Sequence, residues 1–191
     1  SEMCIRDRFN SGMTLRDTIQ SVLSQSFPDI EYILVDGLSQ DRTIKIVKEY
    51  EPLFQNRLKW VSEKDSGLYD AMNKGIAVAT GDYINFMNSG DRFYNEKVIN
   101  SIFSVTKYED IGIIYGDAVY QYPNHCVYRK PLDLDELPRR NCLFHQSMFI
   151  KTKLLKITPY DISFKIAGDY NFSLIQYKRG VKFRYISIPF C

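Results

Sequence analysis

Residues 30–37, IEYILVDG, decide the fold that this sequence predicts. The run is apolar apart from Glu31 and stops at Asp36-Gly37, as is typical of a buried strand that leads into a loop. Two further short apolar runs, 58–61 (LKWV) and 83–87 (YINFM), start at intervals of about 25 residues. The segments between these runs have apolar residues at the spacing of an amphipathic helix. This alternation predicts βαβ units, and therefore an α/β fold with a mostly parallel sheet.

The helices expected around these strands have apolar residues on one face. In the first of them Thr14 is the expected N-cap and Asp17 suits the first turn. After a strand at 111–115 the rhythm changes, so the C-terminal half is expected to be irregular. The expected helices are at 14–26, at 44–50, at 68–79, at 98–103 and at 169–179, and the other expected elements are a hairpin of 117–122 and 126–129, an exposed loop at 132–141 and a strand at 144–150.

The composition favours one soluble globular domain. With 191 residues, 45% of them apolar and 25% charged, the chain can bury a substantial core. A net charge of +2 provides no electrostatic reason to expect nucleic acid as a partner. No apolar run approaches the roughly 18 residues of a membrane-spanning helix. The four cysteines lack CxxC spacing, which argues against a zinc site or a redox pair. Reduced thiols in a cytosolic protein fit best, and a disulfide stays open as the alternative.

Both ends look incomplete. Residues 1–8, SEMCIRDR, show no clear strand pattern, so we expect them to be non-native or disordered. The last residues, VKFRYISIPFC, stop directly after an expected strand. The hypothesis is a fragment truncated at both ends that lacks the first strand of its sheet, with residues 9–191 as a single domain.

Three polar loops follow the expected parallel strands: DGLSQD at 36–41, SEKDSG at 62–67 and NSGD at 88–91. Ligands of open α/β sheets bind beyond the carboxyl ends of the strands, and carboxylates there suit Mg²⁺ or Mn²⁺ on a diphosphate. The same residue types are also ordinary in turns and N-caps. Since the sequence has neither a P-loop nor a GxGxxG motif, a metal ion is expected to meet the phosphate charge.

The order of several segments resembles family 2 glycosyltransferases with a GT-A fold, and most of all the bacterial branch that builds surface polysaccharides. The resemblance covers roughly residues 9–185. It implies a three-layer sandwich with a nucleotide-sugar-binding half at 9–91 and an acceptor half at 92–191. The segments are FNSGMTLRDTIQSVLSQSFPDIEYILVDGLSQDRT (9–43), SEKDSGLYDAMNKGIAVATGDYINFMNSGD (62–91), HQ (145–146) and AGDYNF (167–172).

The resemblance implies roles for the donor side. Asp36 matches the residue that lines the pocket for the donor's base, although Gly37 stands where many relatives have a second aspartate. Asp65 matches a further carboxylate of the donor pocket. The family's DxD metal motif matches 88–91, with Asn88 as a donor contact and Asp91 as the residue that holds Mg²⁺ or Mn²⁺ on the diphosphate.

On the acceptor side, Asp169 matches the catalytic base, and His145-Gln146 match a pair that positions the acceptor. Without the resemblance, Asp169 would be an ordinary first-turn acid, and His145 a hydrogen-bonded structural residue.

The implied function is inverting transfer of a sugar from a nucleoside-diphosphate sugar to a hydroxyl of a glycan or lipid-linked glycan. The implied location is the cytoplasm, with peripheral association at the inner face of the membrane. Two alternatives stay open: a sugar-1-phosphate nucleotidyltransferase, and a fragment that binds nucleotide sugars without turnover.

Overall fold

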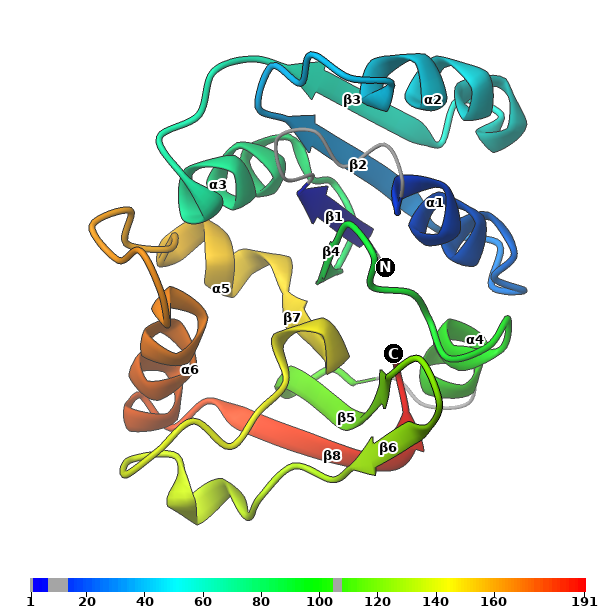
Figure 1. Cartoon of the computed structure of the whole chain (residues 1–191). Helices are drawn as coiled ribbons and strands as arrows, with labels where there is room; N and C mark the ends of the chain where they lie inside the picture. Colours follow the sequence, from blue (N-terminus) through cyan, green and yellow to red (C-terminus); the bar gives the residue numbers. More distant parts are fainter. Residues whose placement is uncertain (1, 7–13, 105–107) are drawn as a thin grey trace.

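The apolar runs of the first half form parallel strands in the computed structural model, which describes residues 2–6, 14–104 and 108–191. They are β2 (Glu31–Asp36), β3 (Leu58–Ser62) and β4 (Tyr83–Asn88). A further strand, β1 (Glu2–Arg6), pairs in parallel with β2 on one side and with β4 on the other. The order β3-β2-β1-β4 forms the parallel part of one sheet (Figure 1).

The second half of the chain extends this sheet with antiparallel and parallel pairs. β7 (Met148–Lys151) pairs antiparallel with both β4 and β5 (Ile111–Gln121), and so joins the two halves. β5 also pairs with β8 (Lys182–Pro189) in parallel and with β6 (Cys126–Arg129) in the predicted hairpin.

Helices cover both faces of the sheet, because successive residues of a strand point to opposite faces. In β2, Tyr32 and Leu34 pack with one set of helices, whereas Ile33 and Val35 pack with the other. Figure 1 shows the first set to the right of the sheet and the second to the left. The first set is α1 (Leu15–Leu23), α2 (Thr43–Tyr50) and α4 (Val98–Phe103), and the second is α3 (Leu68–Val78), α5 (Thr152–Ile157) and α6 (Gly168–Lys178).

The expected disorder of residues 1–8 was wrong for residues 2–6, whereas their non-native origin stays a prediction. Residues 2–6 form β1, the strand that was expected to be missing, while residues 1, 7 and 8 lie outside the described residues. A strand between two parallel neighbours is held by main-chain hydrogen bonds on both edges, so it needs little side-chain patterning of its own.

Three expectations for the second half also need correction. The segment 144–150 is not one strand, because His145–Ser147 form the short 3₁₀ helix η3 before β7. The loop 132–141 contains the 3₁₀ turn η2 (Leu134–Glu136), and Leu137 after it is fully buried. The strand at 111–115 continues through Gly116 into the hairpin as β5. Helix α5 and the 3₁₀ helix η1 (Glu51–Phe54) were not predicted.

The helices of residues 14–104 and 108–191 are all too short or too polar to cross a lipid bilayer.

Candidate active site

The carboxyl ends of β2 and β3 hold Asp36 in a fixed orientation. Asp36 is fully buried and lies in register with Ser62 at the end of β3. The Ser62 hydroxyl donates to Asp36 Oδ2 over 2.5 Å, and the backbone N–H of Ser39 donates to the same oxygen over 3.1 Å. These donors compensate the burial of the carboxylate at this edge of the sheet.

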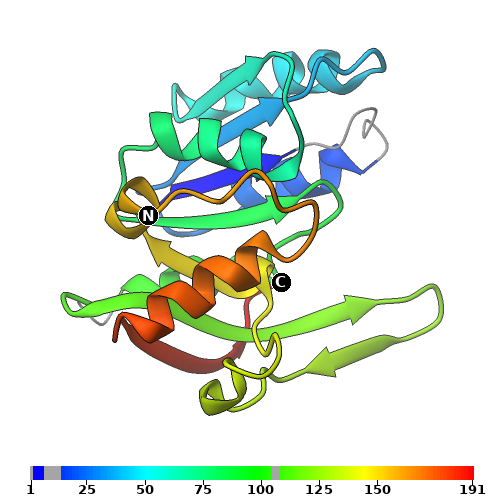
Figure 2. The same cartoon turned by 90° about the vertical axis from the view of Figure 1, so that its left-hand side faces the viewer.

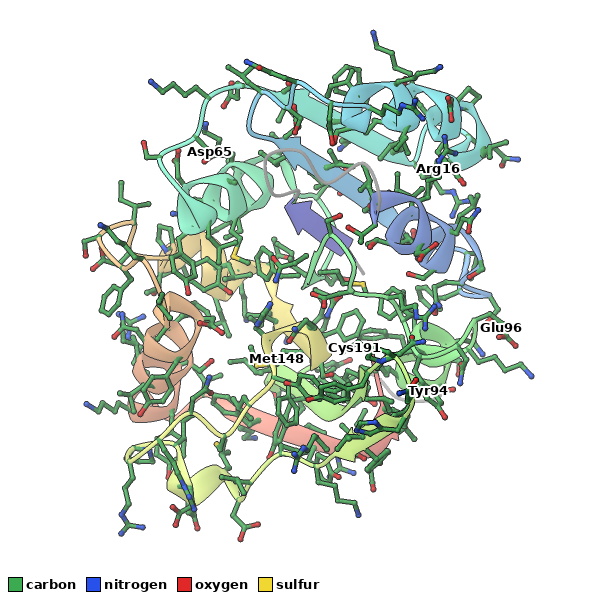
Figure 3. All side chains as sticks on the ribbon, viewed as in Figure 1. Arg16, Asp65, Tyr94, Glu96, Met148 and Cys191 are labelled. Atoms are coloured by element: carbon green, nitrogen blue, oxygen red, sulfur yellow. The ribbon has the colours of Figure 1, made fainter. Side chains whose placement is uncertain are left out.

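Asp65 lies in the loop that leads into α3 (Figure 3), and it approaches the loop after Asp36. Its Oδ1 accepts a hydrogen bond from the backbone N–H of Gly67 over 3.0 Å. A Cβ atom at Gly37 would lie only 2.7 Å from Asp65 Oδ2. Because Gly37 has no side chain, it leaves space for the Asp65 carboxylate. A second aspartate at position 37 would require Asp65 to move.

Residues 88–91 form a tight turn at the end of β4. The backbone N–H of Asp91 donates to the Asn88 carbonyl, and the backbone N–H of Asn88 donates to Asp91 Oδ2, both over 2.9 Å. Gly90 has φ = +98°, which favours glycine, and its N–H donates to Thr18 Oγ1 of α1. The turn is thus locked between β4 and α1, and it presents one carboxylate.

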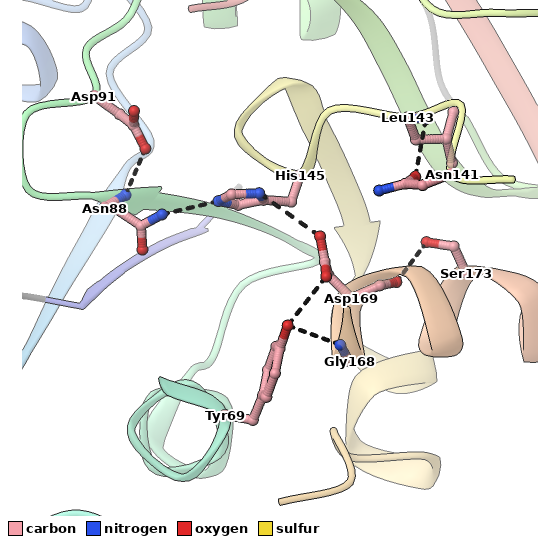
Figure 4. Close-up of polar contacts among 9 residues, drawn as sticks. All are labelled: Tyr69, Asn88, Asp91, Asn141, Leu143, His145, Gly168, Asp169 and Ser173. Carbon is pink, nitrogen blue, oxygen red and sulfur yellow. Dashed lines mark hydrogen bonds and ion pairs between the residues drawn. The ribbon is translucent and has the colours of Figure 1, made fainter. Parts of the chain in front are cut away.

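His145 connects this turn to Asp169 (Figure 4). Its Nε2 lies 2.9 Å from Asn88 Nδ2, and its Nδ1 lies 3.7 Å from Asp169 Oδ2. An amide NH₂ group only donates, so in the neutral imidazole Nε2 accepts from Asn88 and Nδ1 carries the ring proton on the side of Asp169. Both ends of the connection are partly accessible, since the His145 and Asp169 side chains are 25% and 18% exposed.

Tyr69 holds Asp169 from the other side, and the sequence analysis missed it. Its hydroxyl donates to Asp169 Oδ1 over 3.1 Å and accepts from the backbone N–H of Gly168 over 2.7 Å. Burial raises the pKa of the Tyr69 phenol above its ordinary value, and the charge of Asp169 raises it further. The phenol therefore stays a donor at neutral pH. The sequence feature that could have identified Tyr69 is its position at the start of an expected helix, directly after the acidic loop 62–67.

The start of α6 is shaped to fit Tyr69. Ala167 adopts φ = +64°, an uncommon conformation for a residue with a side chain. A Cβ atom at Gly168 would lie 2.8 Å from the Tyr69 ring, so only glycine fits here without displacement. Backbone strain of this kind persists where surrounding contacts impose it, and it gathers at functional sites.

Gln146 borders a different space from His145. Its carbonyl accepts from Asn85 Nδ2 over 2.8 Å. A cavity of about 540 Å³ lies between the turn of Asp91 and the β5–β6 hairpin, and Gln146, Asp91 and Tyr120 are among its lining residues. The structure thus brings Asp91 and Gln146 to one cavity and His145 to Asp169.

The expected cluster of carboxylates is not formed. In residues 2–6, 14–104 and 108–191, no three His, Cys, Asp or Glu side chains gather closely enough to hold a metal ion. The reason is that β1 lies between β2 and β4, and two strand spacings separate their ends by roughly 10 Å. Asp91 alone fits an ion that takes most of its ligands from phosphate oxygens and water, as Mg²⁺ commonly does.

Comparison with known proteins identifies the family. Residues 8–168 match the family described as glycosyl transferase family 2. The chain belongs to this family. A PGL/p-HBAD biosynthesis glycosyltransferase of Mycobacterium tuberculosis is 29% identical over 167 residues, which are 86% of this chain and 65% of that protein. An uncharacterized glycosyltransferase of the same species is 33% identical over 172 residues, 87% of this chain and 64% of that protein. This family 2 chain thus spans about 65% of the length of such relatives.

Solved structures share the fold of this family 2 chain. S. aureus TarS 1-349 in complex with UDP-GlcNAc matches with a TM-score of 0.81 and 18% identity, covering 100% of this chain and 57% of that one. The mannosyltransferase PcManGT from Pyrobaculum calidifontis, in complex with GDP-Man and Mn²⁺, matches with a TM-score of 0.71 and 17% identity, covering 98% and 54%. The predicted family and the predicted α/β fold of GT-A type are therefore confirmed, while the roles of single residues stay predictions.

Proposed function

We propose that this family 2 chain is the catalytic domain of an inverting glycosyltransferase. It transfers a sugar from a nucleoside-diphosphate sugar to a glycan hydroxyl in the synthesis of cell-surface polysaccharide. The observation that carries the proposal is the connection of Asn88, His145 and Asp169 at the carboxyl edge of the sheet, next to the turn of Asp91. Asn88 of the donor side thereby meets His145 and Asp169 of the acceptor side.

Each residue has one task in this proposal. Asp36 and Asp65 contact the nucleoside of the donor, and Gln146 and His145 position the acceptor. Asp169 accepts the proton of the acceptor hydroxyl as that oxygen forms its bond to the anomeric carbon. The bond from that carbon to the diphosphate oxygen breaks on the opposite face, so the nucleoside diphosphate leaves with the electron pair and the configuration inverts.

Asp91 is the residue proposed to hold Mg²⁺ or Mn²⁺ together with the donor diphosphate. Bound there, a divalent ion supplies positive charge that stabilises the leaving diphosphate. Asn88 keeps the turn closed through its backbone N–H, and its amide holds His145.

The direct test is a panel of nucleotide sugars incubated with the protein, Mn²⁺ and a bacterial lipid extract as the source of acceptors. A glycosyltransferase releases nucleoside diphosphate, and only with its own donor. A nucleotidyltransferase would instead form pyrophosphate from sugar 1-phosphate and nucleoside triphosphate. Mn²⁺-dependent nucleotide binding without any release would favour the binding fragment, and no binding to any nucleotide would reject the proposal.

Asp91→Asn is expected to remove the effect of Mn²⁺ on nucleotide binding. Asparagine can still accept from the Asn88 N–H, so the turn stays closed, but the charge that attracts the ion is lost. By calorimetry with UDP and GDP, we expect Mn²⁺ to tighten binding to the wild type at least about tenfold and to leave Asp91→Asn unchanged. Asp133→Asn, at an exposed aspartate before η2, is the control and should behave like the wild type. Tight Mn²⁺ binding to the wild type without nucleotide would contradict the single-carboxylate site.

Tyr69→Phe is expected to lower kcat by about 10- to 100-fold without changing the Kd for the donor, because Asp169 loses one of the contacts that orient it. The control is Tyr83→Phe. Tyr83 is equally buried, and its hydroxyl donates to the carbonyls of Tyr108 and Ile111, in the other apolar core. Tyr83→Phe should lower the free energy of unfolding but preserve kcat. Equal losses of kcat in both variants would show that Tyr69 acts only through stability.

A further inference from the structure

The segment from α5 to the start of α6 exposes four large apolar side chains. They are Ile157, Ile162, Phe164 and Ile166, with exposed fractions of 75%, 59%, 38% and 82%. We call these four residues the loop patch. A single exposed apolar side chain is ordinary, but four on one segment of ten residues indicate an interaction surface.

The loop patch is exposed although its segment is firmly attached to the molecule. Leu155 of α5 and Tyr160 of the loop are buried in the core. Tyr160 also exchanges two hydrogen bonds with the Asn73 side chain of α3, over 2.8 and 2.9 Å. Anchors on the same short segment therefore set the conformation that turns the patch residues outward.

Basic residues accompany the loop patch. Lys153 and Lys156 share the exposed face of α5 with Ile157, and Lys165 lies between Phe164 and Ile166. Among the residues that the structure describes, neither Lys153 nor Lys165 forms an ion pair. In 151–167 the sole acidic residue is Asp161, whose carboxylate accepts from the Ser163 N–H over 2.9 Å. The surface is thus apolar and positively charged.

The C-terminal end of the loop patch lies close in the chain to the proposed catalytic base. Ile166 precedes Asp169 by three positions, and the loop crosses the side of the molecule that Figure 2 turns toward the viewer, between α3 and α6. A surface bound by this loop would lie beside the site where the acceptor is proposed to react.

We propose that the loop patch docks on a lipid bilayer that contains anionic lipids. Apolar side chains enter the interface between head groups and acyl chains, while Lys153 and Lys165 attract the anionic head groups. Charge argues against a second copy of this chain as the occupant, because a two-fold contact would place the same lysines against each other. Docking would place the start of α6, which carries Asp169, near the membrane surface.

The test is co-sedimentation of the protein with vesicles, without nucleotide sugar, so that its outcome is independent of the proposed transfer reaction. Vesicles of phosphatidylcholine with 30% phosphatidylglycerol are compared with vesicles of phosphatidylcholine alone. We expect partitioning onto the anionic vesicles to be at least about tenfold stronger, and to weaken as NaCl is raised. Wild-type protein that stays in the supernatant with both would overturn the proposal.

Substitutions in the loop patch test whether these residues bind the vesicles. The pair Ile157→Ser and Ile166→Ser should lower partitioning at least about tenfold, and the pair Lys153→Gln and Lys165→Gln should remove the preference for anionic vesicles. Leu53→Ser, at a residue of η1 that is 55% exposed, is the matched control and should bind like the wild type. Equal binding by the isoleucine variant would overturn the proposal, and so would a dimer in sedimentation velocity that this variant dissociates. Because all these side chains are exposed, an unchanged circular dichroism spectrum is expected and verifies the fold.

Discussion

Asp169→Asn is expected to stop sugar transfer while leaving the donor bound. General base catalysis contributes about 10²- to 10⁴-fold to a rate, so we expect kcat to fall by about 10²- to 10⁴-fold or more. Asparagine still offers an oxygen to the Tyr69 hydroxyl, which contacts Asp169 Oδ1 in the structure. The variant should therefore keep the start of α6 in place and lose only the ability to take the proton.

The measurement combines release of nucleoside diphosphate with calorimetry of donor binding. Asp135→Asn is the matched control, because Asp135 also accepts from a tyrosine hydroxyl, that of Tyr177, but lies on the exposed turn η2. This control should retain wild-type kcat. If Asp169→Asn keeps more than about a tenth of the wild-type kcat, the assignment of the base is wrong.

Phe149→Ala is expected to cause the largest loss of stability. Phe149 is fully buried in β7, the strand that joins β4 to β5. Its ring packs edge-on against Phe103 and Phe190, with centroids 5.2 and 5.8 Å away, and parallel to Phe93 at 6.4 Å. Removing a buried phenylalanine costs about 3–5 kcal/mol, which is a large part of the 5–15 kcal/mol that is usual for a domain.

Urea denaturation measures this loss, with the fluorescence of the single tryptophan, Trp60, and far-ultraviolet circular dichroism as two probes. Tyr122→Ala is the control, since Tyr122 is 47% exposed on the β5–β6 hairpin. We expect it to change the free energy of unfolding by no more than about 0.5 kcal/mol. A loss below about 1 kcal/mol for Phe149→Ala would contradict the central place of Phe149 in the core.

The local patterns of the chain predicted its first half well. The strands at 30–35, 58–61 and 83–87 each appear within a residue of their expected ends, because short buried parallel strands are apolar throughout and stop at polar loops. Helices α1 and α3 start at or next to their expected residues for the same local reason. The family and the GT-A type of fold were also within reach of the sequence, since the order of several motifs carries them.

The strand β1 and the helix α5 were not predicted, because strand pairing and tertiary packing stabilise them rather than a clear local sequence pattern. β1 is defined by hydrogen bonds to β2 and β4, and its own residues alternate weakly. In α5 only six residues are helical, too few for a clear helical period.

Sequence alone determined the α/β fold class, the family and the candidate residues Asp36, Asp65, Asn88, Asp91, His145, Gln146 and Asp169. Only the tertiary structure decided which of them meet. Asn88 and His145 are 57 positions apart, and Tyr69 and Asp169 are 100 apart, yet each pair is hydrogen-bonded. Conversely, β1 separates Asp91 from Asp36 and Asp65, so the acidic loops do not form one metal cage. Contacts of this range depend on strand order and helix packing, which local residue patterns do not specify.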